Sequence, residues 1–407
     1  MAPALALTAF PNRCVDVVDA AGSSHPTGVA VAETQIGLGK SARRGYRLAE
    51  LDIVPSRRTR NPAEVDTSWQ IDALRFDSPI VAAPSDGVVS PATAVAMSNA
   101  GALGVLHSEG VWCRHEDPAP ALAEIAGIDP AAEGAAVEVL DRVHSLGRPE
   151  VRPELVKARV AEMRSGGATV ALAVSPGLVE ASLEAILAAE PDLLVIEGTV
   201  VSAEHVSDGE PLNLKRVLRR LEVPTIVGGC TSYSAALHLM RTGAAGVLVG
   251  VGPGRVGPTR NVLGIGAASA TAIADARAAR IRHLDETGVY CHVIAHGGVR
   301  NSGDLAAAIC CGADAVVLGD LLAAATEAPA GGWTWAHRSD HPTLPRSRVE
   351  HVTTNGPLQQ ILHGPAVGAD GTTNLVGALA RSMAFAGHVS CKDFQKAELL
   401  VAEGDFR

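Results

Sequence analysis

The chain has 407 residues, enough for two average domains or for one large α/β barrel with insertions. Hydrophobic residues make up 47% of it but aromatic residues only 3%, so the core must be built from Ala, Val, Leu and Ile, as in parallel sheets buried on both faces. The net charge of −10 and the lack of long polybasic runs argue against nucleic acid or an anionic membrane as the main partner.

Residues 1–34 mix Pro, Gly and Ser with short apolar pieces and show no clear period. We predict that they form a mobile N-terminal extension. The opening MAPALALTAF is too short and too weakly charged to be a signal peptide. Residues 35–407 are predicted to form one further domain.

From there on, short aliphatic runs alternate with Ala-rich amphipathic segments. The predicted strands are 80–83, 103–106, 170–173, 193–196, 225–227, 246–249, 292–295 and 315–318. The predicted helices include 91–99, 179–189, 214–221, 234–241, 267–284 and 302–309. This regular order predicts a single TIM (β/α)8 barrel, with a doubly wound open sheet as the alternative, because sequence alone does not show closure.

The last four predicted strands each run into glycine. These loops contain Gly228 and Gly229, the stretch 250–254, Gly297 and Gly298, and Gly319. Glycine here lets the backbone approach a ligand and frees N–H groups to point at it. A tight turn would explain any single pair, but four consecutive loops favour a ligand site.

The pattern breaks after strand eight. Residues 327–372 contain Trp333, Trp335 and several Pro but little periodicity, so we predict a flap-like insertion. Helix returns at 374–387, whose apolar spacing suits the barrel's final helix, and a C-terminal helical tail follows.

The seven cysteines show neither a CxxC pair nor the Cys/His spacing of a metal site. This usage fits a reducing compartment and predicts no metal. No apolar stretch approaches the roughly 20 residues that span a membrane. We therefore expect a cytoplasmic protein.

Seven segments are long and distinctive: ARRGYRLAELDIVPSRRTR, SPIVAAPSDGVVSP, GEPLNLK, LHLMRTGAAGVLVG, GPGRVGPTRNVLGIG, GGVRNSGDLAAAICCGADAVVLG and DGTTNLVGALARSM. Together they resemble the IMP dehydrogenase/GMP reductase family, most closely its branch in actinobacteria and cyanobacteria that lacks CBS regulatory domains. The resemblance covers residues 36–402. It implies a TIM barrel, usually tetrameric or larger, that binds a purine nucleotide beside a nicotinamide cofactor.

The loop after strand six departs from the family pattern GPGSxCTTR, whose Cys thiolate adds to C2 of the purine. Here Gly254 is retained, Arg255 replaces the Ser, and Gly257 replaces the Cys. Thr259 and Arg260 match the family. Covalent catalysis from position 257 is therefore excluded.

Two further ligand contacts differ from the family. The ADGG after strand seven reads AHGG, so His296 replaces an Asp that grips ribose, while Gly297 and Gly298 remain. After strand eight, Gly319 is followed by Asp320 where the family offers Ser or Thr to phosphate. A carboxylate there disfavours phosphate by several kcal/mol, on the order of 4 for unit charges about 4 Å apart at intermediate dielectric, unless a cation such as Arg255 neutralises it.

The resemblance places Glu197 near the nicotinamide and Asp86 on the same side, although both also fit ordinary solvated carboxylates. Gly229, in the loop after strand five, is a predicted ligand contact.

Among residues outside the family motifs, Cys230 is the one cysteine predicted at the barrel mouth and is a candidate replacement nucleophile. Cys310 and Cys311 end a predicted helix and are interpreted as packing residues. His107 and His115 are interpreted as structural or solvent-facing.

Three functions stay open. The favoured one is a repurposed barrel that uses non-covalent acid/base catalysis on another small molecule, with His296, Asp320, Thr259 and Glu197 as catalytic residues. The alternatives are an NAD(P)-dependent purine nucleotide oxidoreductase and a non-catalytic nucleotide-binding regulator. We expect a small-molecule ligand, NAD(P) as the cofactor that the resemblance implies, and a homotetramer or larger assembly.

Overall fold

The computed structural model describes residues 33–203, 212–251, 254, 256–257, 259–337, 343 and 348–402. The chain divides into two compact units, Met1–Gly45 and Tyr46–Arg407. The described part of the first unit contains an antiparallel hairpin of β1 (Glu33–Gly37) and β2 (Lys40–Arg43). Of the predicted N-terminal extension, residues 1–34, all but the last two residues lie outside the described part of the chain.

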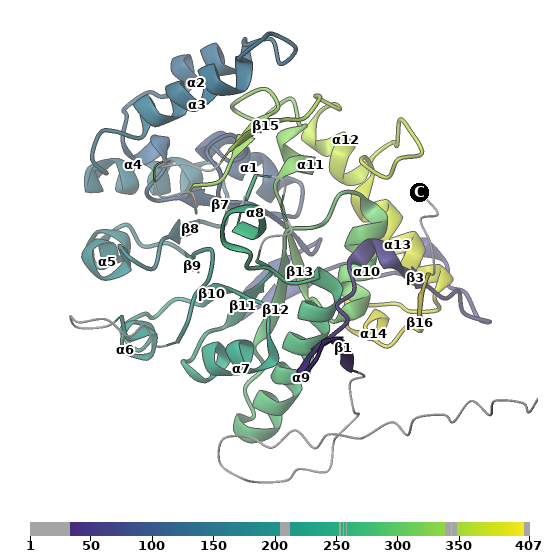
Figure 1. Ribbon diagram of the computed structural model, residues 1–407. Coiled ribbons are helices and arrows are strands. Elements are labelled where there is room, and N and C mark those ends of the chain that lie inside the picture. The colour runs from purple at the N-terminus through teal and green to yellow at the C-terminus, as the bar shows by residue number, and fades with distance from the viewer. Residues whose placement is uncertain are drawn as a thin grey trace, which may run out of the picture. The chain divides into compact units, whose positions relative to one another are not determined.

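The second unit contains a closed barrel of eight parallel strands (Figure 1). In chain order they are β6 (Ile80–Ala82), β7 (Leu103–His107), β8 (Ala171–Val174), β9 (Leu193–Glu197), β10 (Thr225–Cys230), β11 (Gly246–Val249), β12 (His292–His296) and β13 (Ala315–Leu318). The last strand pairs with the first, Val316 opposite Ile80, and this closes the ring. The predicted TIM barrel is confirmed, and the open sheet is excluded.

Successive strand residues alternate between two apolar layers, as the pleat requires. Ile226 and Leu248 pack inside the barrel, whereas Val227 and Val249 pack in the layer that faces the helices. Both faces of the barrel sheet are therefore buried, and both are packed mainly with small aliphatic side chains. At one end the interior cluster also includes Trp69 from a hairpin of β4 (Trp69–Ile71) and β5 (Leu74–Phe76).

Helices surround the strands (Figure 1). They are α1 (Pro91–Asn99), α4 (Pro153–Ser165), α5 (Val179–Ala188), α6 (Leu214–Leu218), α7 (Tyr233–Arg241), α8 (Thr259–Leu263), α9 (Ser269–Thr287), α10 (Ser302–Cys311), α11 (Asp320–Ala323), α13 (Leu375–Phe385) and α14 (Cys391–Phe394). The start of α1 follows from its sequence, since the Ser90 side chain accepts from the Thr93 amide and Pro91 takes the first turn. The strand β3 (Leu51–Ile53) pairs with β16 (Leu399–Val401).

The insertion after β13 is more ordered than its sequence indicated. It contains a hairpin of β14 (Trp333–Trp335) and β15 (Val349–His351), followed by α12 (Leu358–His363). Trp333 and Trp335 are buried in a cluster with two helices that the sequence analysis missed, α2 (Ala119–Ala126) and α3 (Ala135–Leu146). The large apolar surface of the two indoles anchors this segment.

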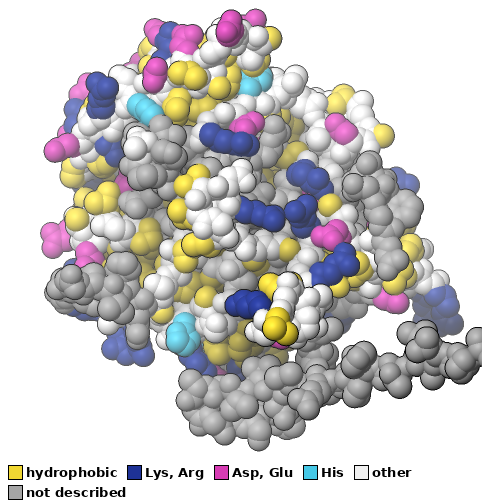
Figure 2. Space-filling model, viewed as in Figure 1, with side chains coloured by type: hydrophobic (Ala, Val, Ile, Leu, Met, Phe, Trp, Pro, Cys, Tyr) yellow, Lys and Arg dark blue, Asp and Glu magenta, His cyan; other side chains and the backbone are white. Residues whose placement is uncertain are grey.

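Acidic, basic and apolar side chains are interspersed over the face shown in Figure 2. Within the described part of the chain, no helix has both the length and the apolar character needed to cross a membrane.

Candidate functional site

A cavity of about 210 Å³ lies at the C-terminal ends of the barrel strands. Its wall is formed by the segments that follow β6, β9, β11, β12 and β13, together with the end of β7 and the residues of and after β14. This is the face at which TIM barrels build their active sites. Segments widely separated in the sequence therefore meet around one cavity.

Most of the predicted site residues line this cavity. They are Glu197, Gly254, Gly257, Thr259, His296, Gly297, Gly298, Gly319 and Asp320. Thr259 is buried at the start of α8, and Asp320 begins α11. The strand-end glycines thus bring the backbone to the site, as their positions indicated.

Two predicted residues lie elsewhere. Asp86 is buried, and its Oδ1 accepts a hydrogen bond from the Val111 amide at 3.0 Å, so it braces the loop after β7. Gly229 lies within β10, where a Cβ would stand 2.7 Å from the Gly250 carbonyl oxygen. Its lack of a side chain allows the backbones of two neighbouring segments to pass closely.

Arg255 and Arg260, in the loop after strand six, were also candidate ligand contacts, but neither is in the described cavity lining. Arg260 is exposed on α8 and is not among the residues that line the cavity. Arg255 lies outside the described residues.

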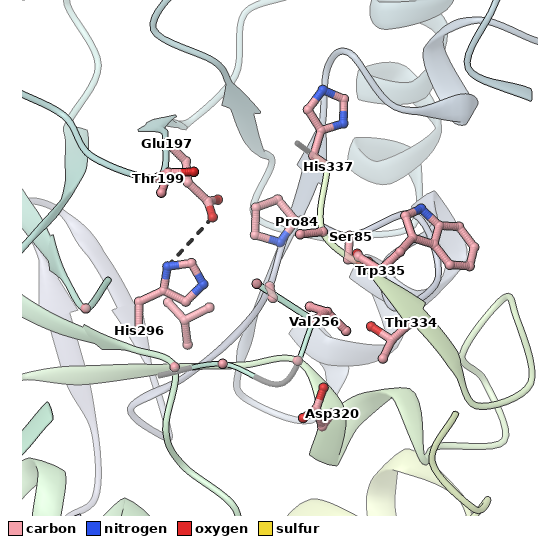
Figure 3. A pocket seen from close by; sticks show the side chains of 18 of the residues that line it. Pro84, Ser85, Glu197, Thr199, Val256, His296, Asp320, Thr334, Trp335 and His337 are labelled. Atoms are coloured by element: carbon pink, nitrogen blue, oxygen red, sulfur yellow. Dashed lines mark hydrogen bonds and ion pairs between the residues drawn. The ribbon is translucent and has the colours of Figure 1, made fainter. Parts of the chain in front are cut away.

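Glu197 lies beside His296, with Oε1 and Nδ1 3.7 Å apart (Figure 3). His296 ends β12 and Glu197 ends β9, so the barrel brings them together from separate strands. The other carboxylate oxygen of Glu197, Oε2, is buried and has no hydrogen-bond partner among the described residues. Asp320, another of the four candidate catalytic residues, lies on another part of the wall (Figure 3).

Gly257 leaves open space beside the cavity. Apart from its chain neighbours, no atom of the described residues stands within 4 Å of the position that its Cβ would take. The described neighbours would therefore leave room for a side chain at position 257.

Cys230 ends β10 at the predicted end of the barrel, but its thiol does not face the cavity, so the interpretation as a replacement nucleophile is wrong. Strand β10 continues to Cys230, whose buried thiol donates to the Leu248 carbonyl at 3.4 Å in the layer between strands and helices. Burial raises the pKa of this thiol to about 12, so it is not a nucleophile at neutral pH. Cys310 and Cys311 are buried at the end of α10, in agreement with a packing role.

His107 is a cavity residue that the sequence analysis assigned to a structural role. It lines the cavity, and its ring stacks on that of His337, with centroids 3.6 Å apart and planes at 21°. Its Nδ1 accepts a hydrogen bond from the Glu109 amide at 3.1 Å. His115 does have a structural role, since its Nε2 contacts the Leu146 carbonyl at 2.8 Å.

Glu109 is buried behind these two imidazoles. Its Oε1 accepts from the Ser175 amide at 2.6 Å and from the Ser175 hydroxyl at 2.5 Å, and its Oε2 lies 3.3 Å from His337 Nε2. Burial alone would raise its pKa, but the bond to His337, the nearby His107 and the bonds from Ser175 together hold the pKa well below its usual range. Glu109 is therefore ionised. In the sequence, the only feature that could have pointed to Glu109 is its position two residues after the end of β7.

One possible ligand atom from each of His107, Glu109 and His337 lies within 4.8 Å of the others, a spacing at which the three could hold a metal ion. The structure favours a hydrogen-bonded cluster instead. The Nδ1 lone pair of His107 is already engaged by the Glu109 amide, and the two rings stack face to face rather than converging on a common point.

Comparison with known proteins agrees with this architecture. Residues 45–339 match the model of the IMP dehydrogenase / GMP reductase domain. An uncharacterised oxidoreductase of Mycolicibacterium smegmatis is 49% identical over 375 residues, which cover 90% of this chain and 99% of that protein. Inosine-5′-monophosphate dehydrogenase of Escherichia coli is 34% identical over 203 residues, 48% of this chain and 39% of that enzyme. The crystal structure of an IMP dehydrogenase/GMP reductase-like protein from Corynebacterium glutamicum superposes with a TM-score of 0.84 at 43% identity, covering 91% of this chain and 97% of that one.

Proposed function

Since the chain belongs to the IMP dehydrogenase/GMP reductase family of oxidoreductases, we propose that it keeps the family's ligand site but acts on a different small metabolite, purine-like or other, by non-covalent acid/base catalysis. The observation that supports this most is the composition of the cavity wall. None of the described cysteines lines it, Gly257 stands where the family's nucleophile is expected, and His296 is present beside Glu197.

In this proposal His296 carries the proton. Its Nδ1 is oriented toward Glu197, which leaves Nε2 as the ring atom for a ligand. A carboxylate beside an imidazole stabilises the imidazolium that forms when the ring accepts a proton. Proton transfer by a positioned histidine contributes roughly 10²- to 10⁴-fold to a rate. The Thr259 hydroxyl, buried in the same wall, would orient the ligand.

A nicotinamide cofactor fits one feature of this wall. Glu197 Oε2 is a buried acceptor without a partner in the described part of the chain, and a carboxamide N–H is a donor that would satisfy it. When bound, the nicotinamide would accept or supply a hydride, while Glu197 would hold its carboxamide and His296 would move the proton. A cavity of about 210 Å³ suits a ring-sized group rather than a whole dinucleotide.

The second candidate is the family's own reaction on a purine nucleotide. The glycines at the strand ends, Gly297, Gly298 and Gly319, favour it because they still line the cavity. Gly257 opposes it, since a glycine forms no covalent adduct.

The test is a turnover and ligand screen with purine nucleosides, their 5′-monophosphates, NAD(P)⁺ and NAD(P)H. Ligands are first ranked by thermal shift, because one at a hundredfold its Kd stabilises the fold by roughly 2.7 kcal/mol. Wild type is then compared with His296→Asn and, as a control, with a change at the exposed His238, His238→Asn. We expect no family-like turnover of IMP or GMP, and loss of any other turnover in His296→Asn alone. Rapid conversion of IMP or GMP by the wild type would instead support the second candidate.

A further inference from the structure

His337 and Glu109 form a second imidazole–carboxylate pair beside the cavity. Figure 3 shows His337 on another part of the wall from His296. His337 follows β14 and lines the cavity. Its partner Glu109 follows β7 and is held from behind by Ser175, whose amide and hydroxyl both donate to Oε1. The remaining oxygen, Oε2, is left to face His337 Nε2 at 3.3 Å.

This contact determines where the hydrogen of the His337 ring resides. An ionised carboxylate only accepts hydrogen bonds, so Nε2 must carry the hydrogen that points at Glu109. In the neutral ring the lone pair is then on Nδ1. His337 Nδ1 is buried and has no hydrogen-bond partner among the residues that the structure describes. A buried acceptor without a donor is unfavourable, and a donor on a ligand or water would remove that penalty.

The ring is also fixed in place. The His107 ring stacks on it at 3.6 Å, and the Ser85 hydroxyl donates to the Trp335 carbonyl at 2.7 Å, which ties β14 to the loop after β6. Two titratable groups contact His337: Glu109 through Oε2 and His107 through its stacked ring. The Nδ1 of His107 is occupied by a backbone amide, so His337 Nδ1 is the nitrogen of this cluster that still lacks a donor.

We propose that His337, oriented by Glu109, is a second proton acceptor of the cavity and that its Nδ1 receives an N–H or O–H hydrogen of the bound small molecule. On full transfer, the Nδ1 lone pair forms the new N–H bond, the electrons of the broken bond stay on the ligand, and Glu109 balances the charge of the imidazolium. His337 would be a catalytic residue and Glu109 a positioning residue. The transfer step rests on the proposed acid/base function, whereas the hydrogen-bonding state of the ring does not.

The first test measures, in the full-length protein, which nitrogen of the His337 ring carries the hydrogen. Side-chain ¹⁵N–¹H spectra of protein labelled with ¹⁵N-histidine report which ring nitrogen carries hydrogen, and His337→Gln assigns the signal. We expect hydrogen on Nε2 in the wild type. Glu109→Gln keeps the size and can still accept from Ser175, but it turns an amide N–H toward Nε2, so the hydrogen should move to Nδ1. Glu116→Gln, at an exposed carboxylate that pairs with Arg152 at 3.4 Å, should leave the signal unchanged.

The second test is turnover with a substrate found in the screen. Glu109→Gln should lower kcat by about tenfold or more, with a smaller effect on KM, and Glu109→Asp should recover part of the loss. A wild-type ring with hydrogen on Nδ1, or no change of state in Glu109→Gln, would overturn the proposal whatever the activity. So would stoichiometric binding of added Zn²⁺ through His107 and His337. If the switch is seen but no compound is turned over, the proposed function fails while the hydrogen-bond acceptor role of His337 stands.

Discussion

His296 Nδ1 and Glu197 Oε1 lie 3.7 Å apart although their residues end two strands, β12 and β9, that are not neighbours in the barrel. The two side chains are 27% and 22% exposed. An ion pair in contact with water contributes little to stability, about 0–1 kcal/mol. Under the proposed function, we expect this contact to affect ligand binding and turnover more than stability.

Replacing Glu197 by Gln tests that conclusion, because it keeps the shape and removes the charge. We expect the free energy of unfolding to change by about 1 kcal/mol or less, while turnover or ligand affinity falls about tenfold or more as the imidazolium loses its counter-charge. Urea denaturation and calorimetry measure the two effects. Glu180→Gln, in an exposed pair with Arg216 at 2.9 Å, is the matched control. Unchanged affinity and turnover in Glu197→Gln would contradict a role in the site.

Gly257→Cys should be tolerated, since among the described residues only the chain neighbours lie within 4 Å of the added Cβ. The new thiol should react with a thiol reagent at neutral pH much faster than Cys230, whose pKa burial raises to about 12. Timed labelling of the native protein should thus show one additional fast thiol relative to the wild type. If the new thiol is protected, position 257 does not face open space.

Gly250→Ala, unlike Gly257→Cys, should destabilise the protein. Gly250 has φ +148°, and an added Cβ would overlap the carbonyl oxygen of His296. We expect a loss of about 2 kcal/mol or more in the free energy of unfolding, measured by urea denaturation beside Gly257→Cys. Equal stability of the two variants would show that the close approach of these segments is not required.

The cavity should discriminate against a 5′-phosphate. Its described lining contains two carboxylates, Glu197 and Asp320, and neither Lys nor Arg. We expect IMP to bind at least about a hundredfold more weakly than to a site with Ser at position 320, a difference of about 2.7 kcal/mol. The double variant Asp320→Ser with His296→Asp should bind IMP more tightly without turning it over, because Gly257 is unchanged. Calorimetry compares the two proteins, and a micromolar Kd for IMP in the wild type would refute the prediction.

Glu109 should make stability depend on pH. Burial works against its ionisation, but the hydrogen bonds from His337 and Ser175 and the nearby His107 hold its pKa well below the usual 4.5. A lowered pKa adds stability that is present above the unfolded value and is lost as pH falls through the folded value. The difference in unfolding free energy between wild type and Glu109→Gln should therefore be largest near neutral pH and shrink below pH 4.5. Denaturant unfolding across this range, with Glu116→Gln as control, checks the slope; a difference that grows in acid would contradict it.

Much of this protein could be predicted from its sequence. The eight strands and the glycines that reach the cavity follow from local signals, because a buried parallel strand needs a short aliphatic run and a backbone near a ligand needs glycine. The regular strand–helix order predicted a barrel, but only the pairing of β13 with β6 shows that the sheet closes. His296 and Glu197 were placed in the site by the family resemblance, which matches each of them to a residue that follows a strand.

Only the tertiary structure decided which side chains meet. Whether His296 pairs with Glu197 or Asp320 depends on the relative stagger of strands that are distant in the sequence. Cys230 turned out to lie within β10 because that strand is longer than its aliphatic run, which set its thiol in the layer between strands and helices. The contact of His337 with Glu109 joins residues 228 positions apart. Periodicity reports the face of one element, but a contact of this kind arises only when separate elements pack against each other.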